Sequence, residues 1–226
     1  MKWTFVIQQK LKVAVLLGIV MCLVVLFNIV LQKNISDINR SVDTMYKDRL
    51  IPVTDIFHLS ESLHQRQLAM ENFLLKTDNN VDELQSELNK YDQRMFSLLD
   101  KYEKTYLVKE ELASLKIFKQ SVNNYAALER KILSLTAAGK KLEGIKLYEA
   151  VGRHSFSNTI SQLSELTTIQ SSVGGKLVND TRGIVATSNF LSHLQMVLAI
   201  IIGAMIVNLV VSSKVINQTQ ENFKWN

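Results

Sequence analysis

Two long apolar runs constrain the fold of this chain more than any other feature. Residues 13–31 are apolar except for Asn28, and residues 194–211 are apolar except for Gln195 and Asn208. An α-helix rises about 1.5 Å per residue, so about 20 apolar residues cross a hydrocarbon layer about 30 Å thick. Each run therefore predicts a transmembrane helix embedded in a lipid bilayer.

The first run could instead be a cleaved signal peptide, because a basic segment precedes it. Its apolar length exceeds the roughly 7–15 residues of a signal peptide, and no small-residue cleavage site follows in residues 31–35. We therefore expect an uncleaved anchor.

Charge predicts the orientation in the membrane. Residues 1–12 and 212–226 together carry five lysines and one glutamate, whereas residues 32–193 carry 21 Lys/Arg and 20 Asp/Glu. Positive residues collect on the cytoplasmic side of transmembrane helices. We predict a multi-pass protein of the bacterial inner (cytoplasmic) membrane, with both termini in the cytoplasm and residues 32–193 outside it. The basic flanks account for the net charge, and no basic face with interleaved aromatics suggests nucleic acid as a partner.

The segment between the runs has the pattern of a helical bundle. It contains one proline, Pro52, and few turn signals, whereas strands need turns every 8–12 residues or so. Apolar residues recur at spacings of three and four, which is typical of amphipathic helices. One such series is Val81, Leu84, Leu88, Tyr91, Met95, Leu98 and Tyr102, and another is Leu115, Phe118, Val122, Tyr125 and Ile132. We predict an all-α protein in which residues 32–193 form an up-down four-helix bundle.

The first bundle helix is expected to grow directly out of the first transmembrane helix. The three-four register runs through Ile35, Ile38, Val42 and Met45, and resumes at Ile56, Leu59, Leu63, Met70 and Phe73. Because proline lacks an N–H and clashes with the preceding turn, Pro52 predicts a kink or short break near residues 50–51.

Turn chemistry predicts the remaining helix boundaries. Residues 77–80 offer N-cap side chains, residues 106–109 make a shorter break, and Gly139 stands where a left-handed cap ends a helix. A short helix ended by Gly152 is expected next. The fourth long helix is expected to run from about Ser155 into the second apolar run.

Two short segments resemble methyl-accepting chemotaxis receptors with a four-helix-bundle sensor domain. Residues 46–52 (Tyr-Lys-Asp-Arg-Leu-Ile-Pro) resemble the Tyr-x-x-Arg-apolar-apolar-Pro stretch of the first sensor helix, and residues 133–140 resemble the break before the fourth. With the two apolar runs, the resemblance covers nearly the whole chain. It implies a ligand-sensing input domain, signal transduction in chemotaxis, and a homodimer.

The resemblance also bears on how a signal would leave the protein. Receptors of this kind continue after the second transmembrane helix into a linker module and a long cytoplasmic coiled coil, and residues 212–226 can supply only a short cytoplasmic tail. We therefore expect the output to pass to a separate partner. A mixed dimer with a full-length receptor is one route.

Residues of catalytic type are scattered rather than grouped. The sequence has no glycine-rich phosphate loop and no serine elbow, and His58 and His64 are six apart on one helix, which directs them to opposite sides. We expect no enzyme activity, no metal site and no cofactor.

Arg49 and Arg66 are the candidate ligand-binding residues. Both fall on the core register of the first bundle helix, and the planar guanidinium suits a carboxylate. They could hold a small organic acid or an amino acid between helices. Alternatively, each could pair with an internal acid such as Glu129, or Arg66 could extend toward solvent from the edge of the stripe.

Two functions remain open at this point. The first is a chemoreceptor-like sensor that binds a small solute in the bundle and passes the change across the membrane. The second is a membrane-anchored structural or scaffold protein that binds another envelope protein and no small ligand. Asn28 and Asn208 could hydrogen-bond between transmembrane helices in either case.

Overall fold

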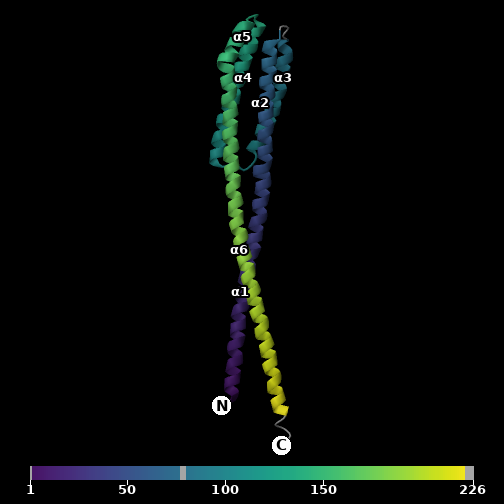
Figure 1. The fold of residues 1–226 in the computed structure, drawn as a ribbon, viewed down its shortest axis with the longest axis vertical. Coiled ribbons are helices and arrows are strands. Elements are labelled where there is room, and N and C mark those ends of the chain that lie inside the picture. Colours follow the sequence, from purple (N-terminus) through teal and green to yellow (C-terminus); the bar gives the residue numbers. More distant parts are fainter. Residues whose placement is uncertain (1, 77–79, 222–226) are drawn as a thin grey trace. The chain divides into compact units, whose positions relative to one another are not determined.

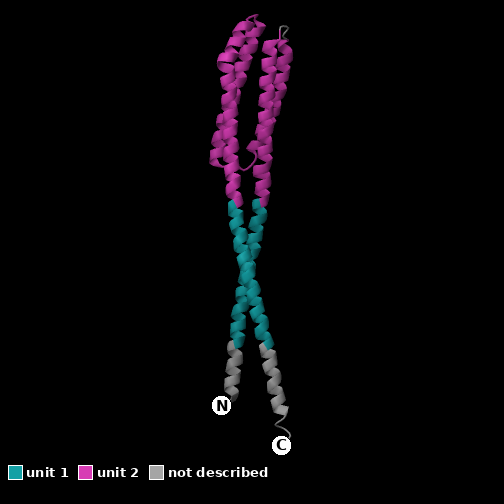
Figure 2. Cartoon of the chain, in the orientation of Figure 1, with its two compact units in different colours: residues 1–41, 179–226 teal, residues 42–178 magenta. Residues whose placement is uncertain are grey.

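The computed structural model describes the backbone of residues 2–76 and 80–221 and the side chains of residues 13–76 and 80–207. Within these ranges the regular elements are all helical (Figure 1), which confirms the all-α prediction. The chain divides into two compact units, residues 42–178 and residues 1–41 with 179–226 (Figure 2).

The second of these units contains most of helix α1 (Lys2–Met45) and the end of helix α6 (Arg153–Glu221). Both helices are long and apolar enough to cross a membrane. Their large apolar side chains are exposed, as at Ile19 and Ile200, which suits contact with lipid. Asn34 Nδ2 donates a hydrogen bond to Ser188 Oγ at 2.9 Å. Asn28 is exposed, and the side chain of Asn208 lies outside the described residues.

The unit of residues 42–178 contains four long helices that alternate in direction (Figure 1). The first is the π-helical turn η1 (Tyr46–Leu50) followed by α2 (Ile51–Leu75). The second and third are α3 (Val81–Glu103) and α4 (Lys109–Ala137). The fourth combines α5 (Lys141–Leu147), the π-helical turn η2 (Tyr148–Gly152) and the start of α6. The predicted four-helix arrangement is therefore present.

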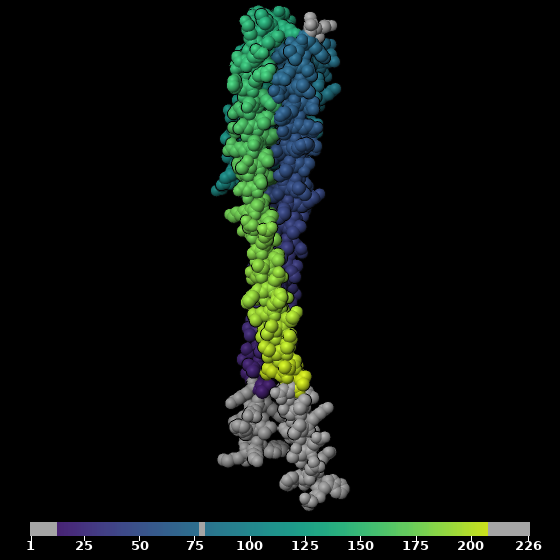
Figure 3. Space-filling view, in the orientation of Figure 1, coloured from purple at the N-terminus to yellow at the C-terminus, as the bar shows by residue number. Residues whose placement is uncertain are grey.

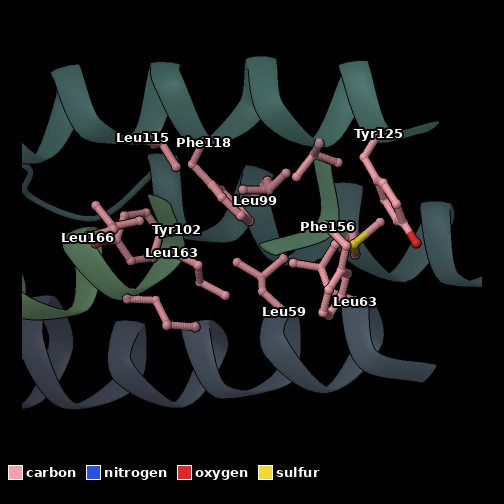
Figure 4. Close-up of a cluster of buried hydrophobic side chains, with 13 residues drawn as sticks. Leu59, Leu63, Leu99, Tyr102, Leu115, Phe118, Tyr125, Phe156, Leu163 and Leu166 are labelled. Atoms are coloured by element: carbon pink, nitrogen blue, oxygen red, sulfur yellow. The ribbon is translucent and has the colours of Figure 1, made fainter. Parts of the chain in front are cut away.

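The core of this bundle consists of the predicted stripes. Side chains of α2 and α4 point toward one another across the bundle, and α6 adds Phe156, Leu163 and Leu166 (Figure 4). A further cluster surrounds Met70 and Ile132. One member of the stripe on α3 differs from the prediction, because Leu99 is buried where Leu98 is only half-buried, whereas the last member, Tyr102, is buried as predicted. Upstream, Ile35 and Val42 are exposed.

Two predicted helix boundaries are confirmed in detail. The Asn80 side chain accepts a hydrogen bond from the Glu83 N–H and caps α3. Gly139 has φ of 77°, which favours glycine, and the Gly139 and Lys140 N–H groups donate to the carbonyls of Thr136 and Leu135. These two bonds satisfy carbonyls left free at the end of α4.

Of the kink or short break predicted near residues 50–51, the break is not present: the helix continues, and a wider turn accommodates Pro52. The Ile51 N–H donates to the Tyr46 carbonyl five residues earlier, a π-helical bond, and Pro52 occupies the first turn of α2. An extra residue in one turn relieves the steric conflict without ending the helix.

The prediction that Gly152 ends a short helix is wrong. The chain passes from α5 through η2 into α6 without a break, and the Arg153 N–H donates to the Tyr148 carbonyl. A Cβ on Gly152 would lie 2.5 Å from Cδ2 of the buried Tyr148 ring. The glycine is needed here for a close side-chain approach inside a π-helical turn and not for a left-handed cap.

Candidate functional site

A buried polar cluster, the Arg49 cluster, joins three parts of the bundle at η1. Arg49 Nη1 donates to Glu111 Oε1 of α4 at 2.6 Å and to Gln170 Oε1 of α6 at 2.5 Å. Arg49 Nη2 donates to the Tyr106 carbonyl in the α3–α4 loop at 3.3 Å. Glu111 is fully buried and Gln170 is 1% exposed. The cluster therefore ties the first bundle helix to both α4 and α6.

The proline next to this cluster explains the position of Gln170. Pro52 has no N–H, so the Asp48 carbonyl four residues earlier lacks its usual α-helical donor. Gln170 Nε2 donates to that carbonyl at 3.1 Å. The amide of Gln170 thus accepts from Arg49 and donates to Asp48. A side chain of α6 completes the hydrogen bonds of the first helix where proline interrupts them.

Glu111 also has two roles. Its Oε2 accepts from the Val108 N–H at 2.9 Å, which satisfies a free donor at the start of α4, while its Oε1 receives Arg49. Nearby, Asp48 Oδ1 accepts from the Tyr106 N–H at 3.0 Å. The start of α4 and the loop before it are therefore fixed to η1 through charged hydrogen bonds, which are about twice as strong as neutral ones.

Some polar atoms around the cluster have no partner among the described residues. These buried atoms are Arg49 Nε, Tyr102 Oη and Ser114 Oγ. Burial, together with the Glu111 carboxylate, raises the pKa of the Tyr102 hydroxyl above its usual range. Tyr102 therefore stays a neutral donor.

The second predicted arginine forms a separate cluster, the Arg66 cluster. Arg66 Nε donates to Glu129 Oε2 of α4 at 2.5 Å, and Arg66 Nη1 donates to Asp92 Oδ1 of α3. Burial opposes the charged form of Arg66, but Glu129 and Asp92 outweigh it and raise its pKa. The structure thus contains the internal Arg66–Glu129 pair that the sequence offered as an alternative to ligand binding.

The two candidate arginines do not form one site. They lie 17 residues apart on one helix, which corresponds to about 25 Å along its axis. Each is buried and paired with internal acids. A carboxylate ligand would have to replace one of these acids to reach either guanidinium.

An open groove between α2 and α3, the α2–α3 groove, offers more room. Its volume is about 500 Å³, within the usual range for small-molecule sites. Lys76 contributes a cation, Glu83 and Glu87 contribute carboxylates, and Gln65 and Asn72 contribute amides. Groups of both signs line it, so it suits a small zwitterion. Its lining combines polar side chains of two helices with the buried Phe73 and Leu84, so no local sequence pattern predicts the groove.

Metal ligands do not gather in the part of the chain that the structure describes. No group of three or more His, Cys, Asp or Glu side chains there could hold a metal ion. His58 lies 3.2 Å from Glu61, which also pairs with Arg94, and all three side chains are partly exposed to solvent.

Comparison with known proteins identifies the family. The profile described as a four helix bundle sensory module for signal transduction matches residues 4–184, most of the chain. No curated protein and no solved structure matches the chain. The match includes both arginine clusters and the α2–α3 groove. The chain belongs to the family of four-helix-bundle sensory modules of chemotaxis receptors.

Proposed function

We propose that this chain is a chemoreceptor-type sensor anchored in the bacterial cytoplasmic membrane. Two helices long and apolar enough to cross a membrane support the anchoring. The basic flanks, residues 1–12 and 212–226, favour the cytoplasm for both termini. Residues 13–31 and 194–211 would then span the bilayer, with residues 32–193 outside the cell membrane.

The Arg49 cluster is the observation that carries this proposal. It links the first and last helices of the bundle, which lie side by side in Figures 1 and 3. The first helix continues α1 without a break and the last contains the start of α6, and α1 and α6 contain the two apolar runs. Packed helices move between discrete arrangements and do not deform smoothly. A ligand that favours one arrangement of the bundle would therefore alter the tie between these two helices.

The ligand would be a small organic acid or an amino acid. The α2–α3 groove suits the zwitterion, with Lys76 facing its carboxylate and Glu83 or Glu87 facing its ammonium group. Arg49 and Arg66 are the other candidates, and a ligand there must displace Glu111 or Glu129. The groove needs no such displacement.

The ligand is identified by thermal unfolding of the full chain in lipid nanodiscs against a panel of amino acids and organic acids. A ligand that binds only the folded state stabilises it by about 2.7 kcal/mol at 100 times its Kd. We expect an upward shift of Tm for one chemical class, and loss of the shift in the Lys76→Ala variant.

Control variants locate the site. Lys90→Ala removes an exposed lysine of α3 outside the groove and should leave the shift unchanged. A shift that survives Lys76→Ala but is lost in Arg66→Lys, which keeps the charge without the planar fork, would place the ligand at the Arg66 cluster. No shift with any solute would favour the scaffold function.

A homodimer would form along an exposed apolar stripe of the first bundle helix. The stripe follows the three-four spacing of helix–helix seams, and Phe57 at its end is 66% exposed. A second copy presents an identical stripe. Alternatively, a full-length receptor with a similar first helix could form a mixed dimer and pass the signal to the cytoplasm. The stripe consists of Val42, Tyr46, Leu50, Val53 and Phe57.

Placing a charge on this stripe should dissociate the dimer. We expect Val53→Lys to convert a dimeric chain to a monomer in detergent, because the lysine would be desolvated against its symmetry mate. Light scattering of the purified chain measures the mass. Ile117→Lys, at an exposed apolar position of α4 outside the stripe, is the matched control and should remain dimeric. A monomeric wild-type chain would contradict the proposal.

A further inference from the structure

The Arg66 cluster contains one more acid than base. Glu129 is 1% exposed, and Arg66 Nε binds its Oε2, while its Oε1 has no partner among the described residues. The same guanidinium also serves Asp92, whose side chain is 24% exposed. A buried carboxylate with one oxygen unpaired is costly unless it is neutralised.

We propose that Glu129 is a proton-binding site, and that uptake of a proton there changes how α2 is tied to α4. Ionised Glu129 holds Arg66 to α4, whereas Asp92 holds the same arginine to α3 in both forms. After protonation, the Arg66 guanidinium is paired with the Asp92 carboxylate alone. The contact between α2 and α4 is therefore weakened, whereas the contact between α2 and α3 is kept. The stimulus is the proton concentration outside the cytoplasm.

The proton adds a second hydrogen-bond donor beside the Tyr125 hydroxyl. One turn before Glu129 on α4, the Oη of Tyr125 is also buried and unpaired. The Tyr125 hydroxyl can donate to the ionised carboxylate, and a neutral Glu129 carboxyl can instead donate its new O–H to Tyr125 Oη. The proton comes from water and returns to water, so the step needs no other reactant.

The groups around Glu129 agree with uptake near neutral pH. Burial and the Asp92 carboxylate of α3 raise the pKa of Glu129 to about 7, against Arg66 of α2 and the Tyr125 hydroxyl, which both lower it. Tyr125 lies on α4 itself, and Tyr148 of η2 faces Tyr125. Burial also raises the pKa of the Tyr125 hydroxyl above its usual range, so this group stays protonated.

Water can reach the edge of the cluster. A hollow of about 60 Å³ between α3 and α4 is lined by Asp92 and Arg130 among others, and this volume admits a water molecule. The proton can therefore enter beside Asp92. This site is independent of the α2–α3 groove, so failure of the solute screen would leave it untouched.

Infrared difference spectroscopy of the full chain in nanodiscs tests the proposal. Between about pH 8 and about pH 6 we expect the carbonyl band of a protonated, buried carboxyl to appear in the wild type. Glu129→Gln should abolish that band. Glu165→Gln, the same change at an exposed position of α6, should retain it.

A thermal titration gives the second readout. The raised pKa in the folded state means that stability falls as the pH rises from about 4.5 toward 7, because the folded form binds the proton more tightly. Wild-type Tm should fall over this range. The contribution of Glu129 to that fall should be absent in the Glu129→Gln variant. Glu129→Asp keeps a carboxyl and should keep a band. A band that persists in Glu129→Gln, or no titrating band in the wild type, overturns the proposal.

Discussion

Replacing Arg66 by alanine should lower the free energy of unfolding of the bundle by about 3–5 kcal/mol, because it leaves buried acids without their cation. Glu129 loses the guanidinium at its Oε2, and Asp92 loses the same partner. Denaturant unfolding of the full chain in detergent, followed by circular dichroism, measures the change. The loss should be smaller at about pH 5 than at about pH 8, because an unpaired buried glutamate is neutralised by a proton.

Two comparisons establish the cause of that loss. Arg94→Ala removes the exposed pair with Glu61 and should cost only about 0–1 kcal/mol. Adding Glu129→Gln to Arg66→Ala removes the unpaired charge and should restore part of the stability. If Arg66→Ala cost no more than Arg94→Ala, the Arg66 cluster would contribute nothing to the bundle.

Replacing Arg49 by alanine should cost a similar amount, about 3–5 kcal/mol, and should also loosen α6 against the first helix. Glu111 is fully buried and would lose its cation, while Gln170 would lose one of its two partners. Spin labels at the exposed positions 54 and 171, in a chain with Cys22 replaced by serine, report the separation of these helices. We expect a broader distance distribution in Arg49→Ala than in the wild type.

The neighbouring Lys47 supplies the control for this experiment. Lys47→Ala removes an exposed pair with Asp43 in the turn before Arg49 and should leave both stability and distances unchanged. Gln170→Ala should cost about 1–3 kcal/mol, because the Asp48 carbonyl loses its donor. An unchanged distance distribution in both Arg49→Ala and Gln170→Ala would contradict the tie between the first and last helices.

The helical core could be predicted because its signal is local and periodic. Leu59 on α2, and Phe118 and Tyr125 on α4, each belong to a series of apolar residues spaced along one face of their helix. All three are buried. The caps at Asn80 and Gly139 were also predictable, because each depends on the chemistry of a few adjacent residues. In these cases the residues themselves contain most of the information.

The site was harder to predict because its contacts join distant parts of the sequence. Arg49 and Arg66 were identified by register, but Glu111 resembles an ordinary acid in the first turn of a helix. Gln170 carries no local signal, since its position is explained by the carbonyl that Pro52 leaves free more than 100 residues earlier. Gly152 was misinterpreted because glycine ends helices more often than it makes room for a tyrosine ring.

The two π-helical turns have a consequence for anyone who exchanges parts of this protein with a relative. Each turn spaces its hydrogen bond over five residues instead of four, so it adds a residue to the helix without breaking it. The residues after Leu50 are therefore rotated about the helix axis, relative to the residues before Tyr46, by a different angle than in an unbroken α-helix. A chimera joined inside η1 or η2 would rotate the transplanted helix about its axis by the equivalent of one residue. Junctions placed outside both turns would keep the original facing of every side chain.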